Sequence, residues 1–413
     1  MHKVIRDPIH GYIEIDDLAI AILETVELQR LRRIRQLGFS YLVYPGANHT
    51  RFEHSLGTYH LMNVLLDKLA VKKEEEAELR VASLIHDIGH GPYSHVTEPL
   101  IRTFTGKSHE DIEEMLFVHE LQRSDAEDRS LHIAEVLEDY CLDTHKIQGH
   151  IKNTGEGGGK DFAKILNGEI DVDKMDYLVR DSYYTGVAYG VLDNMRLIQG
   201  LDFFEGQLVI TEKGILPAEY LLFSRFLMYP TVYRHHTSRI ARLMFARAVE
   251  HYINTKTSAL EYALALREMD DFELDVTLRS AEGYPKEMMA RINERRLFKR
   301  AVYTGINVLE AHVVEELDAE DRVKELEHEI SIKAGIDEKY VIIDFQGAEE
   351  ESLKESDARV LIRDEQSTRS LREVSELVSM LSRVFWEKCK LGVYTPGKYR
   401  AAVKKAAESV LWR

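Results

Sequence analysis

One stretch constrains the fold of this chain more than any other. Residues 82–95 read ASLIHDIGHGPYSH, in which an apolar run leads into adjacent His86 and Asp87, and Gly91-Pro92 ends any helix that carries them. On a helix, His90 would lie one turn after His86 on the same face. Histidine and aspartate together, with no cysteine nearby, suit a catalytic divalent metal better than a structural zinc. For this pair alone, histidine capping of a helix C-terminus is an equally good interpretation.

Two further segments place polar side chains at helical spacing. A Pro-Gly turn precedes a helix that begins after Thr50, with Glu53 completing a capping box, and Arg51 and His54 share one face of that helix. In the segment 168–181, the side chains of Asp173, Tyr177 and Asp181 form a polar stripe opposite an apolar face. An exposed acidic helix would also explain that second pattern.

The remaining pattern predicts a mainly α protein. Apolar spacing predicts one helix over 18–37, whose other face carries Arg30, Arg32, Arg33 and Arg35 as either a solvated face or an anion-binding face. We also expect a hairpin or short strand within 4–15, a strand pair in 201–216, and a long helix over 221–249 interrupted near Pro230. Strands over 340–345 and 358–362 and a helix over 370–390 predict a small α+β lobe. The expected domains are 1–325 and 326–413.

Composition limits the possible partners. The 54 basic and 71 acidic residues give a net charge of −17, which argues against broad binding to a nucleic acid backbone. The two cysteines are far apart, and neither a signal peptide pattern nor a long apolar run is present. We therefore expect a cytoplasmic protein that does not bind membranes.

Five motifs in order give a resemblance to a known family. DPIHGYIEI, LQRLRRIRQLG, YPGANHTRFEHSLG, LIHDIGHGPYSH and DVDKMDYLVRDSYYTG resemble the HD superfamily of metal-dependent phosphohydrolases, in its deoxynucleoside triphosphate (dNTP) triphosphohydrolase branch. The likeness runs from about residue 4 to 240, with an HD core at about 45–185, and continues more weakly through the C-terminal lobe. No sterile-alpha-motif domain, which the vertebrate enzyme carries, is expected here.

The resemblance implies a metal centre and a reaction. His54, His86, Asp87 and Asp173 match the metal ligands, and two nitrogens with two carboxylates suit Mn, Mg, Fe, Co or Ni. Such a metal lowers the pKa of a bound water and holds a phosphate oxygen. In the family this water attacks the α-phosphorus of a dNTP, which releases the deoxynucleoside and inorganic triphosphate.

The resemblance also assigns roles around the metal. His95 matches the proton donor, a role that the near-neutral pKa of histidine suits. The other matching positions are His90 and His109 in the same histidine cluster, Arg51, Lys174 and Arg225 at the phosphates, Tyr177 and Asp181 at the sugar 3′-hydroxyl, Gln36 and Leu37 beside the sugar, and Tyr233 beside the base. Tyr177 under the ribose would crowd a 2′-hydroxyl and so favour deoxynucleotides.

Regulation and assembly follow the family less closely. Arg6 and Glu24 stand where the vertebrate activator site has an asparagine and an aspartate, which puts activation by a guanine nucleotide in question. A homo-oligomer, either a tetramer or a dimer, is expected. Two other functions stay open: hydrolysis of a different nucleotide by an HD phosphohydrolase or phosphodiesterase, and nucleotide or nucleic acid binding without turnover.

Overall fold

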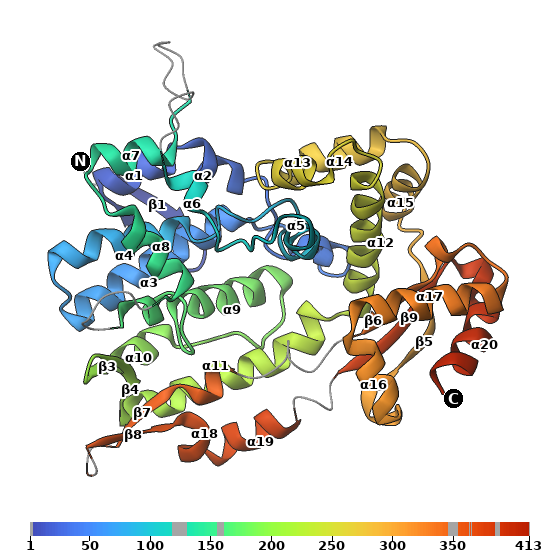
Figure 1. The fold of residues 1–413 in the computed structure, drawn as a ribbon. Helices are drawn as coiled ribbons and strands as arrows, with labels where there is room; N and C mark the ends of the chain where they lie inside the picture. The colour runs from blue at the N-terminus through green and yellow to red at the C-terminus, as the bar shows by residue number, and fades with distance from the viewer. Residues whose placement is uncertain are drawn as a thin grey trace.

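The protein is mainly helical. The computed structural model describes residues 3–117, 130–154, 161–345, 354–362, 364, 366–384 and 389–412. Helices make up most of this part of the chain, and its strands form three small sheets (Figure 1). The predicted fold class, a helical core with a smaller α+β lobe, is confirmed. None of the described helices is long and apolar enough to cross a membrane.

The chain opens with the predicted hairpin. Strand β1 (Lys3–Asp7) pairs antiparallel with β2 (Gly11–Ile15). In the turn, Asp7 Oδ1 accepts the backbone N–H groups of Ile9 and His10 at 2.9 and 2.8 Å. Gly11 closes the turn with a φ of +77°, a left-handed conformation that glycine adopts without strain. The hairpin thereby fixes Asp7 and His10 beside the helical body.

The segment predicted as one helix over 18–37 is two short helices and an irregular connection, so that prediction is wrong. Helix α1 (Asp17–Leu23) ends before Thr25, and α2 (Val26–Leu31) ends before Arg32. Beyond that point the backbone of Arg35 forms a bridge with Thr50, and its N–H donates to Asp271 Oδ2 at 3.0 Å. These contacts hold the backbone away from a helical path, so tertiary contacts override the apolar spacing.

Three helices form the centre of the N-terminal body. Helix α3 (Arg51–Leu69) begins with the predicted capping box, in which the Thr50 N–H donates to Glu53 Oε2 at 2.6 Å. It packs against α4 (Lys73–Ile85) and α9 (Val172–Thr185). A Cβ at Gly57 of α3 would lie 1.9 Å from Asp176 Oδ1, so only glycine allows α3 and α9 to come this close.

Shorter helices surround this centre and cover its apolar side chains. They are α5 (Glu98–Thr105), α6 (Glu113–Leu116), α7 (Ile133–Asp139), α8 (Thr144–Lys152) and α10 (Asn194–Gln199). Buried aliphatic side chains from the hairpin, from α6, α7, α8 and α10 and from α3 and α4 form one large core, whereas Ile101 of α5 belongs to a second one. The core holds the ends of α3, α4 and α9 in fixed positions.

The predicted interrupted helix is confirmed. Helix α11 (Ile215–Met228) is followed by a π-helical turn, Tyr229–Tyr233, and then by α12 (His236–Ile253). Pro230 lies in that turn, where a proline removes a backbone donor and breaks the regular ladder. Helix α12 forms a second core with three more helices (Figure 1): α13 (Ala259–Ala265), α14 (Asp271–Ser280) and α15 (Tyr284–Asn293).

The C-terminal lobe contains a three-stranded antiparallel sheet. Its strand order is β5 (Lys299–Gly305), β9 (Lys390–Thr395) and β6 (Ile342–Phe345). The lobe's helices are α16 (Ala311–Asp318), α17 (Glu320–Ala334) and α20 (Arg400–Leu411). Strands β5 and β9 pair with each other although they lie on opposite sides of residue 325 in the chain. The expected domain division at residue 325 stays a prediction.

The two strands expected in the same small lobe belong to different sheets. Strand β7 (Arg359–Ile362) lies between β4 (Gln207–Ile210) and β8 (Ser367–Ser370), in a sheet that β3 (Leu201–Phe204) completes. The predicted helix over 370–390 is instead α18 (Leu371–Val374) and α19 (Glu376–Val384), residues 385–388 lie outside the described residues, and β9 follows. The chain thus returns beneath α11 to the N-terminal body (Figure 1).

Candidate metal centre

The four predicted metal ligands converge because three helix ends meet. His54 lies in the first turn of α3, His86 and Asp87 follow directly after α4, and Asp173 lies in the first turn of α9. His54 Nε2 lies 2.8 Å from Asp173 Oδ1 and 3.8 Å from Asp87 Oδ2. His86 Nε2 lies 3.5 Å from Asp87 Oδ1 and 3.7 Å from Asp173 Oδ1.

Hydrogen bonds turn the same nitrogen of both histidines toward this centre. His54 Nδ1 bonds to Asp176 Oδ2 at 2.8 Å, and His86 Nδ1 bonds to the Ser83 carbonyl oxygen at 2.9 Å. Each Nδ1 therefore donates, which leaves Nε2 as the ligand atom. His86 Nε2 is buried and has no hydrogen-bond partner among the described residues. An imidazole nitrogen in that position, beside two carboxylates, fits a divalent cation.

The charges of the centre also fit a cation. Burial opposes ionisation of both His54 and Asp87. Hydrogen bonds to Asp173 and Asp176 nevertheless raise the pKa of His54 to about 10. Arg51, His86 and His54 lower the pKa of Asp87 to about 2. The carboxylates thus draw a proton onto a buried histidine, at a place where a metal ion would supply the positive charge instead.

A buried network that the sequence did not reveal holds His54 in place. Asp176 accepts from His54, from His10 Nε2 at 2.7 Å and from Arg180 Nε at 2.8 Å. Arg180 Nη1 also donates to Asp7 Oδ2 at 2.8 Å. The spacing of Asp176 and Arg180 does suggest an ion pair, but their complete burial and their link to His54 depend on contacts with the distant hairpin.

Arg51 lies directly beside the centre. Its Nη1 is 2.7 Å from Asp87 Oδ2, and its Nε donates to Ser94 Oγ at 2.6 Å. Only 3% of Arg51 is exposed, so its charge is held in one orientation by these contacts. A fixed guanidinium next to the centre is suited to orient a phosphate oxygen.

The three predicted site histidines form a second cluster next to Asp87. His90 is buried, with Nε2 3.4 Å from Asp87 Oδ1, and its ring stacks on His109 at a centroid distance of 4.0 Å. The more exposed His95 bonds through Nδ1 to Glu98 at 2.8 Å, and His109 bonds to the same carboxylate. Burial opposes ionisation of Glu98, but hydrogen bonds with His109 and His95 hold the pKa of Glu98 well below its usual range.

The predicted sugar and base contacts meet at Asp181. His49 Nε2 lies 2.7 Å from Asp181 Oδ1, and Tyr233 Oη donates to Asp181 Oδ2 at 2.8 Å. The ring of Tyr177 lies between this group and the metal centre, with centroids 6.2 Å from Tyr233 and 6.5 Å from His54. The two predicted sugar-side residues lie nearby, with the N–H of Gln36 donating to the His49 carbonyl oxygen at 3.0 Å and Leu37 next in the chain.

The other two predicted phosphate contacts already have acidic partners. Lys174 Nζ lies 2.6 Å from Asp171 Oδ2 and 4.0 Å from Glu355 Oε1. Arg225 donates to Glu355 and, at 3.1 Å, to Tyr229 Oη. Glu355 is a site neighbour that sequence reasoning missed, because it comes from the C-terminal part of the chain.

The arginine-rich face near residues 30–35 is solvated in part, as one of the two interpretations predicted, because Arg32 and Arg33 are exposed, whereas Arg35 is half-buried and Arg30 is buried. Arg30 is buried and donates to the carbonyl oxygens of Ile88 and His90. The remaining arginines also have protein partners: Arg32 stacks over Phe52, Arg33 bonds to Asp270 and Arg35 lies near Asp271. Arg30 therefore supports the loop that carries the predicted metal ligands His86 and Asp87.

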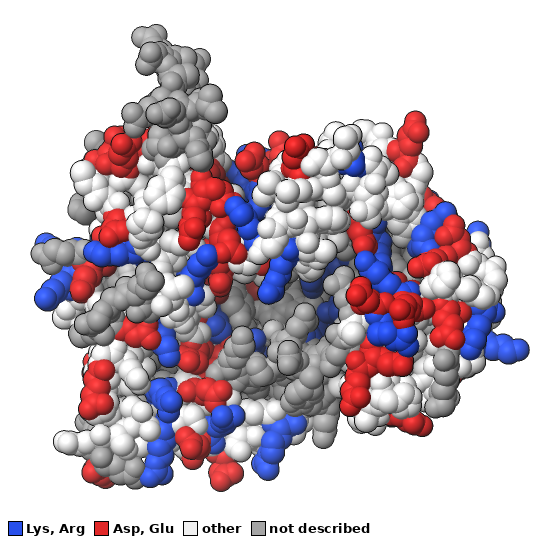
Figure 2. Space-filling view, viewed as in Figure 1, with Lys and Arg blue, Asp and Glu red and all other residues white. Residues whose placement is uncertain are grey.

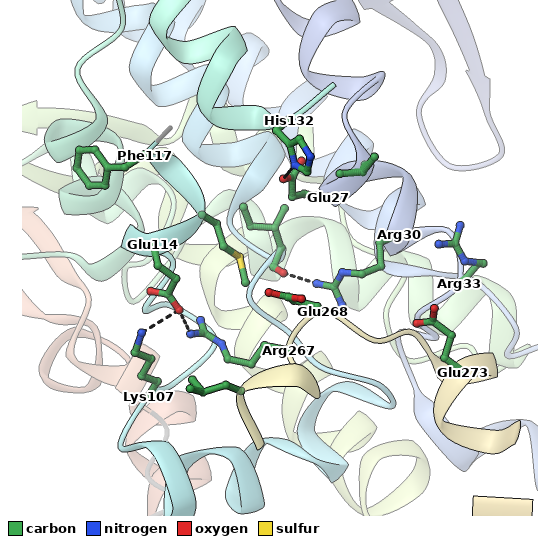
Figure 3. Close-up of a pocket in the computed structure, with 14 residues that line it drawn as sticks. Glu27, Arg30, Arg33, Lys107, Glu114, Phe117, His132, Arg267, Glu268 and Glu273 are labelled. Carbon is green, nitrogen blue, oxygen red and sulfur yellow. Dashed lines mark hydrogen bonds and ion pairs between the residues drawn. The ribbon is translucent and has the colours of Figure 1, made fainter. Parts of the chain in front are cut away.

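A pocket of about 590 Å³ borders that loop at Ile88 (Figure 3). Arg30 and Ile88 line it, together with charged residues, some of which pair with one another. Glu114 meets Lys107 at 2.9 Å and also Arg267, as the dashed lines in Figure 3 show. The pocket holds none of the predicted site residues.

The positions that depart from the vertebrate activator site lie on the surface. Arg6 is exposed and stacks over Tyr12 at 4.5 Å, and Glu24 is exposed at the end of α1. The nucleotide activator and the homo-oligomer stay predictions. Lysine and arginine side chains are interspersed with acidic ones on the face that Figure 2 shows.

Two family models match most of this chain. The HD domain model matches residues 51–181, and the HD associated region model matches residues 192–412. An uncharacterized protein of Methanocaldococcus jannaschii is 36% identical over 95% of this chain and 79% of its own length. The deoxynucleoside triphosphate triphosphohydrolase SAMHD1 of Gallus gallus is 30% identical over 72% of this chain and 55% of its own length. A crystal structure of a phosphohydrolase from Bacteroides thetaiotaomicron has a TM-score of 0.75 at 26% identity and covers 96% of this chain and 100% of that one.

Proposed function

The chain belongs to the HD-domain family of phosphohydrolases, and from this premise we propose that it hydrolyses dNTPs to deoxynucleosides and inorganic triphosphate. One observation carries the proposal: four side chains suited to hold a metal ion lie next to Arg51 on one side and to the Tyr177–Asp181–Tyr233 group on the other. Relatives named as dNTP triphosphohydrolases, 30–36% identical to this chain, support the same substrate class.

The centre would hold a divalent cation through His54, His86, Asp87 and Asp173. Such a cation supplies a Lewis acid that activates a water molecule and neutralises phosphate charge. Asp176 keeps the His54 ring in the tautomer that presents Nε2, and the Ser83 carbonyl oxygen does the same for His86. The native metal stays undetermined among Mn, Mg, Fe, Co and Ni.

The phosphate chain would lie along Arg51, Lys174 and Arg225. Hydrolysis at the α-phosphorus forms a bond from water oxygen to phosphorus and breaks the bond from phosphorus to the sugar 5′-oxygen. That oxygen needs a proton, for which His95 is suited because Nδ1 is held by ionised Glu98 and Nε2 remains available. His90 and His109 pack beside this donor and restrict its orientation.

The nucleoside would lie beyond the phosphates at the second polar group. The carboxylate of Asp181 can accept a hydrogen bond from a sugar 3′-hydroxyl, while Tyr177, Gln36 and Leu37 surround the sugar and Tyr233 contacts the base. Tyr177 next to the ribose would leave little room for a 2′-hydroxyl. This placement supports deoxynucleotides over ribonucleotides.

Product analysis tests the reaction. Purified protein is incubated with each dNTP, with and without Mn²⁺ or Mg²⁺ and then in mixtures that contain dGTP or GTP, and the products are separated by anion exchange. We expect deoxynucleoside and intact inorganic triphosphate. Release of phosphate or pyrophosphate, or no product in any mixture, would contradict the proposal and favour another HD phosphohydrolase substrate or a binding protein.

Two substitutions test the assigned roles. Tyr177→Ala is expected to reduce the preference for dATP over ATP, measured as a ratio of kcat/KM values. His95→Ala is expected to keep the metal and lower kcat by about 10²–10⁴-fold. An unchanged preference in the first variant, or loss of metal in the second, would show that the corresponding role is misassigned.

A further inference from the structure

Glu355 lies at the proposed phosphate end of the site, although it belongs to the C-terminal part of the chain. It stands in a single helical turn, Lys354–Asp357, just before β7, and only 1% of the residue is exposed. Its carboxylate accepts a hydrogen bond from Arg225 and lies 4.0 Å from Lys174 Nζ. A carboxylate thus contacts both of these cations.

The protein core tethers this carboxylate. Ala358 and Val360 follow the turn and are buried in the core of the N-terminal body. Strand β7 pairs with β4 at Val360 and Ile210, and the Leu371 N–H donates to the Ala358 carbonyl oxygen at 2.8 Å. Because these contacts keep Glu355 beside the cations, it competes with any incoming anion at a high effective concentration.

The cations can still accept another anion. Arg225 Nε is buried and has no hydrogen-bond partner among the described residues. Lys174 Nζ is held mainly by Asp171, at 2.6 Å, and lies 4.0 Å from Glu355, so Arg225 is the cation that Glu355 chiefly occupies. A phosphate group that reaches these side chains must share them with the Glu355 carboxylate or displace it. Competition from this carboxylate weakens the binding of every anion, and a ligand with several phosphate groups offsets the loss by its attraction to the other cations of the site.

We propose that Glu355 is a specificity-determining residue of the phosphate subsite. Its carboxylate rejects anions of low charge, whereas a chain of three phosphate groups competes with it successfully. The inference rests on the proposed function, which places the phosphates at Lys174 and Arg225, and it adds the residue that selects triphosphates over shorter nucleotides.

Calorimetric titration with inorganic anions tests this inference without any need for turnover. Phosphate, pyrophosphate and tripolyphosphate are titrated into the full-length protein in buffer containing Mg²⁺. The wild type is expected to bind tripolyphosphate at least about tenfold more tightly than pyrophosphate. Glu355→Gln is expected to bind pyrophosphate about tenfold more tightly than the wild type, and so to narrow the difference between the two anions.

Asp357→Asn is the matched control. Asp357 lies in the same turn but is exposed and pairs with Arg372 at 2.8 Å, so this variant should bind all three anions as the wild type does. Equal affinities of the wild type for phosphate and tripolyphosphate would overturn the inference. It would also be overturned if Glu355→Gln gained no affinity for pyrophosphate, or if the control gained as much.

A second variant tests the inference if Glu355→Gln fails to fold, as a loss of cooperative unfolding would show. Glu355→Asp keeps the charge but withdraws it from the cations by one methylene, so it should bind pyrophosphate more tightly than the wild type. Unchanged binding would again overturn the inference. The predicted changes in anion binding together with no hydrolysis of any dNTP would refute the proposed function and leave the role of Glu355 standing.

Discussion

The metal centre and the pocket of Figure 3 contact the same loop, yet they organise charge in opposite ways. In the centre, His86 Nε2 is buried without a hydrogen-bond partner in the described part of the chain, beside the carboxylates of Asp87 and Asp173. In the pocket, Glu114 pairs with both Lys107 and Arg267. A buried imidazole nitrogen that has no hydrogen-bond partner, beside two carboxylates, is suited to a cation, whereas Glu114 is already stabilised by its two basic partners. The absence of a partner for a buried polar atom therefore indicates a candidate site better than the volume of a pocket does.

The largest effect should come from Asp173→Ala. The change removes one carboxylate of the centre from a side chain that is 33% exposed, so the fold should survive. We expect loss of bound metal and a fall in kcat on the order of 10³-fold. Metal content per chain and dNTP hydrolysis measure the two effects. If the variant kept both its bound metal and its kcat, Asp173 would not be a metal ligand, and the comparison of the centre with the pocket would fail.

Asp176→Asn should have the next largest effect, because it removes a buried charge behind the centre. Arg180 would lose its charged partner on α9, and the single amide oxygen of asparagine could not accept from both His54 and His10 as the two carboxylate oxygens do. We expect a loss of about 3–5 kcal/mol in the free energy of unfolding. Metal affinity should weaken about 10–100-fold.

Denaturant titration and metal titration separate those two contributions of Asp176. Weaker metal binding at denaturant concentrations where the variant is fully folded would confirm that Asp176 positions His54. Unchanged metal affinity with lower stability would limit the network to a role in folding.

Removal of the metal should lower the stability of the wild type by less than Asp176→Asn does. A ligand present at 100 times its Kd stabilises the folded state by about 2.7 kcal/mol, so a chelator should lower the melting temperature of the wild type by several degrees. Asp173→Ala should show no such shift, whereas a variant in the Figure 3 pocket should shift as the wild type does. A chelator effect that persists in Asp173→Ala would indicate a metal bound elsewhere.

The residues proposed for the metal centre could be predicted from the sequence, whereas the network that holds them in place could not, and the reason is physical. The predicted ligands lie in short motifs at helix ends, where local spacing already brings His86 and Asp87 together. The support depends on contacts across the chain: Asp176 bonds to His10 and Arg180 bonds to Asp7, more than 160 residues away in each case. Periodicity can indicate the ion pair of Asp176 and Arg180 on one helix, but it cannot indicate that a hairpin buries it.

The same limit explains the differences in the fold. Strands β6 and β7 were expected because their apolar residues form short runs, a local property. Their partners were not, because β7 pairs with β4 and β6 with β9, and those pairings are set by distant segments. Glu355 enters the site through this unexpected pairing, so sequence reasoning about the N-terminal motifs could not have found it.

The smallest effect should come from Glu114→Gln in the Figure 3 pocket. Glu114 is 37% exposed, so solvent weakens its pairs with Lys107 and Arg267. Arg267 itself is 2% exposed and also donates to the Asp111 carbonyl oxygen, so it keeps one partner after the change. We expect a loss of about 1 kcal/mol in the free energy of unfolding, with metal content and kcat unchanged. A tenfold fall in kcat without loss of stability would mean that the pocket acts on the loop through Arg30. The difference between paired and unpaired charge would then no longer distinguish the proposed metal centre from the Figure 3 pocket.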